Sequence, residues 1–165
     1  MAQRAAGRDQ TVVRQSLQHY ANLGTFRSFA EAEPCGRAAV FRFVWFRELS
    51  FTVTFAPQAR RLVFQNLLPG VPARSAMDRD LRGFLKERYS RELPEHRRIE
   101  VRKLDVRALN RRGSISLVFT MKGDHAAYGI RKAVNLVHEI FTIFLNEGRY
   151  AEYQVEHLRL DPEMA

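Results

Sequence analysis

The spacing of hydrophobic and polar residues predicts five strands. Residues 49–55 alternate Leu, Phe, Val and Phe with Ser and Thr, a period of two that is typical of a strand with one buried face. Residues 38–46 are rich in aromatic and β-branched side chains, and residues 61–68, 103–110 and 114–122 follow related patterns. Short turns connect most of the predicted strands that follow one another, which favours an antiparallel sheet.

Three further stretches have apolar residues spaced by three and four positions, as in amphipathic helices. They span residues 11–23, 75–90 and about 124–147. Ser75 and Asp78 resemble a capping box, with Asp in place of the usual Glu. The predicted order is therefore α-β-β-β-α-β-β-α. This order predicts an α+β fold with helices packed on one antiparallel five-stranded sheet.

Three segments lie outside these elements. Residues 1–10 are expected to form a disordered tail. Residues 25–37 are expected to be a connector, because Pro34 and a following glycine interrupt regular structure. The conformation of residues 149–165 is left open between helix and strand, although their apolar residues indicate docking. We therefore expect one α+β domain over residues 11–165.

Composition indicates a cytoplasmic protein with a packed core. The 165 residues are 45% hydrophobic, which is ample for a core at this length. The single cysteine, Cys35, cannot form an internal disulfide, and this favours a reducing compartment. The first ten residues lack the apolar segment of a secretory signal. No apolar run approaches the roughly 20 residues of a membrane-spanning helix, so we expect no membrane association.

The chain is strongly basic, with a formal net charge of +9. Residues 74–112 hold 13 of the cations and seven carboxylates, a net charge of +6. We select Arg97, Arg98, Arg111 and Arg112 as candidate anion- or partner-binding residues, because paired arginines can grip phosphates. Interleaved carboxylates favour the alternative, in which these arginines form ordinary surface ion pairs.

The long helix carries a second candidate group. Arg131, Asn135, His138 and Thr142 follow one another at helical spacing and form one polar row. Its first three members are candidates for binding an anion or a partner. The alternative is the ordinary solvent face of an amphipathic helix.

Catalytic and metal-binding patterns are missing from the sequence. One cysteine excludes thiolate zinc motifs, and the five histidines show no zinc-binding spacing. There is no glycine-rich phosphate loop and no nucleophile-elbow motif. We therefore expect no enzyme activity, no metal and no cofactor.

The order of elements resembles that of bacterial type III secretion chaperones and YbjN-type domains. The stretches VFRFVWF and LSFTVTF, the helix after Ser75, the hairpin around residues 111–113 and the helix GIRKAVNLVHEIFTIFL carry this resemblance. Members of these families bind other proteins, usually as dimers, without catalysis. The resemblance implies a non-enzymatic, chaperone- or adaptor-like module that binds a protein partner, with a homodimer as its expected form. The basic charge departs from the acidic character of the chaperones.

The alternative hypothesis is a nucleic-acid-binding protein that uses the basic surface of residues 74–112. The strands carry Ser, Thr and Arg on their polar faces rather than aromatic residues on which bases could stack. Val118 is an exception on its polar face and indicates partial burial there.

Overall fold

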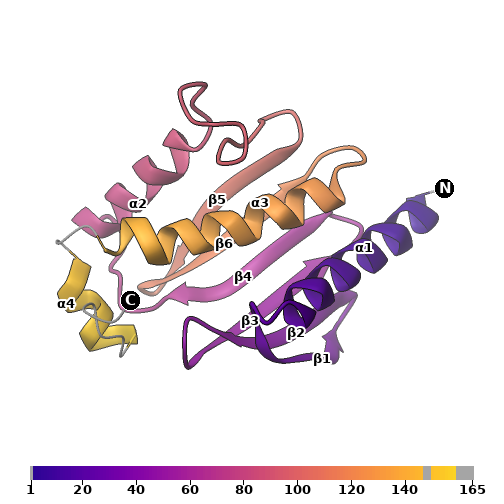
Figure 1. The fold of residues 1–165 in the computed structure, drawn as a ribbon, viewed down its shortest axis with the longest axis horizontal. Coiled ribbons are helices and arrows are strands. Elements are labelled where there is room, and N and C mark those ends of the chain that lie inside the picture. Colours follow the sequence, from indigo (N-terminus) through magenta and orange to yellow (C-terminus); the bar gives the residue numbers. More distant parts are fainter. Residues whose placement is uncertain (1, 147–149, 159–165) are drawn as a thin grey trace.

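The computed structural model has an α+β fold, in which an antiparallel sheet carries α1 and α3 on one face (Figure 1). It describes residues 2–146 and 150–158. The strands are β1 (Arg27–Cys35), β2 (Ala38–Trp45), β3 (Leu49–Ala56), β4 (Arg61–Leu68), β5 (Leu104–Arg111) and β6 (Ser114–Met121). The helices are α1 (Ala2–Asn22), α2 (Ala76–Glu87), α3 (Ala126–Glu139) and α4 (Ala151–Tyr153), with π-helical segments at Ile140–Phe144 and Gln154–Leu158.

The strand order across the sheet is β1-β2-β3-β4-β6-β5, and all neighbouring strands are antiparallel. The first four strands are consecutive hairpins. The chain then forms α2 and enters the sheet again as the edge strand β5. β6 returns between β4 and β5 and leads into α3.

The sheet has six strands, so the prediction of five was wrong. The additional strand, β1, lies in the segment 25–37 that was expected to be a connector. Pro34 is tolerated because β1 is an edge strand, where a residue without an N–H group costs little. The pairing with β2 is also irregular between Ala32 and Cys35. Gly36, with φ of +61°, lies in the turn of the hairpin to β2.

The expected disordered tail at residues 1–10 also differs from the structure, because α1 begins at Ala2. This segment has small alanines instead of large apolar residues, and alanine has the highest helix propensity. Ala6 is buried, and the carboxylate of Asp9 lies 3.4 Å from Nε of Arg60. These tertiary contacts extend the helix beyond its hydrophobic pattern.

The core lies between the sheet and the helices. Alternate strand positions supply a nearly continuous layer of aromatic rings. This layer contains Phe41, Phe43, Phe51, Phe55, Phe64 and Phe119. Val13 and Leu17 of α1 and Val137 of α3 are fully buried against the same cluster. Gly129 brings α3 close to β6, because a Cβ there would lie 2.6 Å from Cγ of Met121.

The strand positions between these buried residues form the opposite face of the sheet, which we call the open face. Most of its residues are partly or fully exposed, whereas Val40 and Ser116 are buried. The exposed and partly exposed residues include Arg42, Val44, Thr52, Thr54, Arg61, Val63, Gln65, Asp105, Arg107, Leu109, Arg111, Val118 and Thr120. Because α1 and α3 lie over the other face (Figure 1), the open face carries no helix within the described part of the chain.

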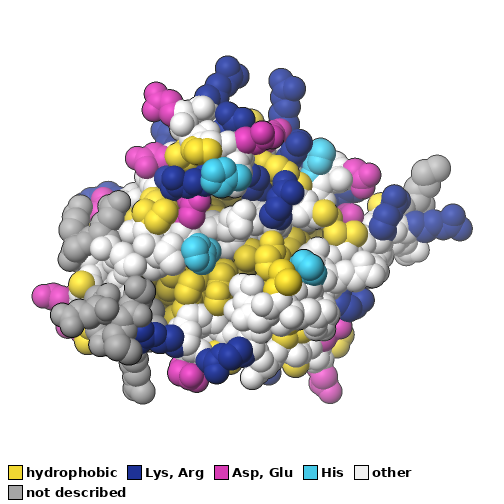
Figure 2. Space-filling model, in the orientation of Figure 1, with side chains coloured by type: hydrophobic (Ala, Val, Ile, Leu, Met, Phe, Trp, Pro, Cys, Tyr) yellow, Lys and Arg dark blue, Asp and Glu magenta, His cyan; other side chains and the backbone are white. Residues whose placement is uncertain are grey.

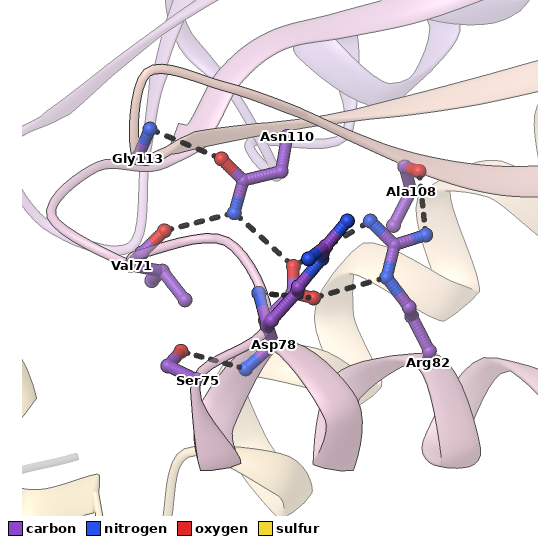
Figure 3. A network of polar contacts seen from close by, with 8 residues as sticks. Val71, Ser75, Asp78, Arg82, Ala108, Asn110 and Gly113 are labelled. Atoms are coloured by element: carbon purple, nitrogen blue, oxygen red, sulfur yellow. Dashed lines mark hydrogen bonds and ion pairs between the residues drawn. The ribbon is translucent and has the colours of Figure 1, made fainter.

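A polar network fixes the start of α2 (Figure 3). Ser75 caps the helix, as predicted, because its side chain accepts a hydrogen bond of 3.3 Å from the backbone N–H of Asp78. Asp78 is only 4% exposed and accepts hydrogen bonds from the backbone of Arg74 and the side chain of Arg82. Burial alone would raise the pKa of Asp78. The hydrogen bonds from Arg82, Asn110 and Arg74 outweigh burial and hold this pKa below its ordinary value of 3.8.

Asn110 extends this network to the hairpin between β5 and β6. Its Nδ2 donates to Asp78 at 3.1 Å and to the carbonyl oxygen of Val71 at 2.8 Å, while its Oδ1 accepts from the N–H of Gly113. Arg112 and Gly113 both have positive φ values, which suit a tight hairpin turn. The network thus ties α2 to the far end of β5 (Figure 3).

Asp78→Asn is expected to lower the free energy of unfolding by about 2 kcal/mol at pH 7, because it removes charge-assisted hydrogen bonds from a buried site. The depressed pKa of Asp78 means that its ionised form contributes fully above pH 3.8, and that this contribution is lost as the pH falls through the lower folded pKa. Urea unfolding of the wild type, Asp78→Asn and the exposed control Asp124→Asn between pH 7 and 3 measures both effects. A loss in Asp78→Asn no larger than in the control would refute the role of the network.

Candidate functional site

The polar row on the long helix lies on the solvent side of α3. Arg131, Asn135 and His138 are all exposed, and Thr142 follows in the π-helical segment. The row does not form one site. Arg131 and Asn135 line a hollow beside the segment that connects α2 to β5, whereas the ring of His138 lies 6.1 Å from that of Phe46.

Arg97 has a structural partner in α3. Its Nε donates to one carboxylate oxygen of Glu139 at 3.1 Å, and Nη1 of Arg88 donates to the other at 2.5 Å. Glu139 and Arg88 are 8% and 5% exposed. The hydrogen bond from Arg97 to Glu139 therefore attaches the segment that connects α2 to β5 to helix α3. Arg98 is half-buried in the same segment.

Arg111 and Arg112 lie at the tip of the hairpin between β5 and β6, where both are exposed. Arg97 instead contacts Glu139 of α3. The structure therefore places the two arginine pairs on different elements, the connecting segment on α3 and the hairpin between β5 and β6.

The edge strand β5 faces a groove of about 660 Å³ beside α2. Two side chains of this helical segment hydrogen-bond to the outward backbone groups of β5. Tyr89 accepts from the N–H of Val106 at 2.9 Å, and Arg82 donates to the carbonyl oxygen of Ala108 at 3.0 Å. Such contacts block the addition of another strand. At the opposite edge, β1 is interrupted by Pro34 and by its irregular register.

A second hollow, of about 510 Å³, lies on the open face beside β5. Three cations, Arg61, Arg107 and Lys122, line it together with one carboxylate, Asp105. Arg107 and Asp105 form an ion pair at 3.0 Å. The hollow also contains Leu109, a large apolar side chain that is 40% exposed.

The middle of the open face carries uncharged side chains. Strand pairing aligns Thr54 with Val63, Val63 with Val118, and Val118 with Arg107. Thr54, Val63 and Val118 are β-branched and partly exposed. At strand spacings of about 4.8 Å and rises of about 3.3 Å, the whole face measures roughly 24 by 26 Å, or about 600 Å². This area approaches the roughly 800 Å² that each partner buries in a standard protein interface.

One feature of the sequence indicated this surface, namely Val118 among polar neighbours. Leu109 was not selected from the sequence, because a single leucine on a strand does not reveal which face it occupies until the register is known. Glu139 and Arg88 were also missed. Their partnership joins residues 51 positions apart, so no local pattern reports it.

The described residues include no group of three or more His, Cys, Asp or Glu side chains placed to hold a metal ion. Cys35 is exposed at the end of β1. None of the helices in the described ranges is both long and apolar enough to cross a membrane.

Glu139→Ala is expected to lower the free energy of unfolding by about 3 kcal/mol, because it leaves the buried guanidinium of Arg88 without its main partner. Glu87 offers a matched control, since its carboxylate also lies 3.9 Å from Arg88 but is largely exposed. Glu87→Ala is expected to change stability by less than about 0.5 kcal/mol. Chemical denaturation measures both, and equal losses would contradict the structural role of Glu139.

The described surface thus offers an uncovered sheet face with an uncharged middle and basic residues around it. The cations selected from the sequence are divided between a structural ion pair, a hairpin tip and the outer side of α3. No protein-family model, curated protein or solved structure matches this chain significantly.

Proposed function

We propose that this chain is a non-enzymatic interaction module that binds another protein through its open face. The observation that carries this proposal is a six-stranded sheet whose helices, within residues 2–146 and 150–158, lie on one side. Val63, Val118 and Leu109 provide apolar contact area at the middle and at the β5 side. Interfaces of this kind combine an apolar centre with a polar border in which arginine is common.

The charge of the open face favours an acidic partner. Arg42, Arg61, Arg107 and Arg111 occupy positions on this face. The carboxylate of Asp105, on the same face of β5, pairs with Arg107 at 3.0 Å. Complementary charge speeds association and selects among partners. Because two outward backbone groups of β5, at Val106 and Ala108, are hydrogen-bonded to side chains and β1 is irregular, the partner contacts side chains of the face and adds no strand.

Protein is favoured over nucleic acid by the position of the aromatic residues. The strand phenylalanines face the core, and the open-face positions of the described strands carry no ring on which a base could stack. The element order points the same way, since it resembles type III secretion chaperones and YbjN-type domains, which bind proteins. The additional strand β1 departs from the order expected for them.

A second copy of the chain is a less suitable occupant of this face than an acidic protein. A two-fold interface places the same patch of both copies in contact. Arg42, Arg61 and Arg107 would then approach the same cations of the other copy, and like charges oppose association. A homodimer of this module would use a different surface.

Two substitutions test the face directly. Leu109→Asp introduces a charge at an apolar position on the β5 side of the open face, and Arg42→Glu reverses an exposed cation. Each is expected to weaken capture of a discrete protein partner from native lysate by at least about tenfold, which corresponds to about 1.4 kcal/mol of binding free energy. Quantitative mass spectrometry of nuclease-treated pull-downs measures the retained partner.

Matched controls separate this effect from general changes in charge or hydrophobicity. Leu23→Asp replaces an exposed leucine after α1, and Arg79→Glu reverses an exposed cation on α2. Both are expected to retain the partner. The proposal fails if all four variants bind alike. It also fails if nuclease removes the partner from the wild type, an outcome that would favour nucleic-acid binding through the basic surface.

A further inference from the structure

A concave cluster of cations lies away from the open face, between α3 and the segment that connects α2 to β5. The hollow measures about 480 Å³. Figure 2 shows Lys and Arg side chains gathered around a histidine in this upper part of the molecule. Its lining consists of Glu95, His96, Glu100, Lys103, Tyr128, Arg131, Lys132 and Asn135.

Three cations surround one aromatic ring in this hollow. Nζ of Lys103 lies 4.8 Å from the centre of the Tyr128 ring, Nζ of Lys132 lies 5.4 Å away, and Cζ of Arg131 lies 5.7 Å away. The face of an aromatic ring attracts cations, so Tyr128 holds these three side chains near one another. The hydroxyl of Tyr128 accepts a hydrogen bond from the N–H of Glu100, which fixes the ring.

Lys132 is the most buried of these cations, with 5% of the residue exposed. Within the described part of the chain, its ammonium group donates one hydrogen bond, of 2.8 Å, to the carbonyl oxygen of Glu95. An ammonium group has three donors. Burial lowers the pKa of Lys132, and the charges of Arg131 and Arg98 lower it further, against opposing effects of Glu100 and Glu95.

The carboxylates of the hollow do not balance its cations. Glu100 pairs with Lys103 at 3.4 Å, whereas Arg131 takes part in no ion pair within the described residues and Lys132 bonds to a backbone oxygen. Arg98 adds a further positive charge close to Lys132. Glu95 remains as an exposed carboxylate on the border. A concave surface with excess positive charge concentrates anions.

We infer that this hollow binds a phosphate group, with Lys103, Arg131 and Lys132 as its cationic ligands and Asn135 as a polar neighbour. Phosphate suits the site because it carries close to two negative charges at neutral pH and several acceptor oxygens. Arginine and lysine are its usual side-chain donors. The hollow is larger than a free phosphate ion, so a phosphate ester of a small molecule has room to bind. This site does not depend on the proposed partner-binding face.

Isothermal titration calorimetry of the full chain tests the inference with inorganic phosphate and with glycerol phosphate, at pH 7.5 and constant ionic strength set by sodium chloride. Saturable binding is expected for one or both. Tighter binding of glycerol phosphate identifies a phosphate ester as the ligand class, and weaker binding identifies free phosphate. Equal binding shows that the site recognises the phosphate group alone. Amide chemical shifts in residues 95–103 and 128–135 are expected to change with the same saturation curve.

Variants assign the binding to the hollow. Arg131→Gln and Lys103→Gln each are expected to weaken binding about tenfold, the scale of one charge-assisted hydrogen bond. Arg79→Gln makes the same change of charge on α2 and is expected to have no effect. Lys132→Met is a further variant, but it removes a buried residue and can impair folding. Arg131 is exposed, so Arg131→Gln tests the site without this complication. Absence of saturable binding, or equal weakening by Arg79→Gln and Arg131→Gln, overturns the inference.

Discussion

Burial of one aromatic face of the sheet under α1 and α3 is the constraint on which the remaining structure depends. Stacked aromatic rings join neighbouring elements of this core. The ring centres of Phe26 and Phe43 are 4.0 Å apart, and those of Phe46 and Phe141 are 4.5 Å apart. Aromatic pairs in this range add to the free energy of burial. Because side chains alternate along a strand, burying this set commits the intervening set to the other face.

The same constraint places the two candidate sites on different parts of the molecule. The open face is formed by the residues that the aromatic layer excludes, and it carries small, β-branched and basic side chains. The outer side of α3 is formed by the residues that its packing on β6 excludes. Polar networks around Asp78 and Glu139 then attach α2 and the segment after it to this framework. Buried charges in such networks must be paired to be tolerated.

Local patterns were sufficient to predict most of the elements. The strands predicted at residues 38–46, 49–55 and 61–68 agree with β2, β3 and β4 to within one residue. Ser75 was also assigned correctly as a helix cap, because capping depends on neighbours in the chain. β1 and the beginning of α1 were not predicted. Pro34 is acceptable only at a sheet edge, and the alanines are held by contacts with distant residues.

The candidate sites were less predictable than the fold. Arg97 was selected from a basic stretch and Arg131 from a polar row at helical spacing, but neither signal distinguishes a structural arginine from one that faces a hollow. The distinction depends on Glu139, which is 42 residues from Arg97 in the sequence. The open face likewise becomes visible only when the register aligns Val63 with Val118. Long-range pairing of this kind is absent from local sequence patterns.

Radical footprinting of the complex tests most directly whether a protein partner covers the open face. Side-chain labelling in the free chain and in the complex can be compared at Leu109, Val118 and Leu23. The partner is expected to reduce labelling at Leu109 and Val118 and to leave labelling at Leu23 unchanged. Undiminished labelling at both open-face residues, with protection elsewhere, would contradict the proposal.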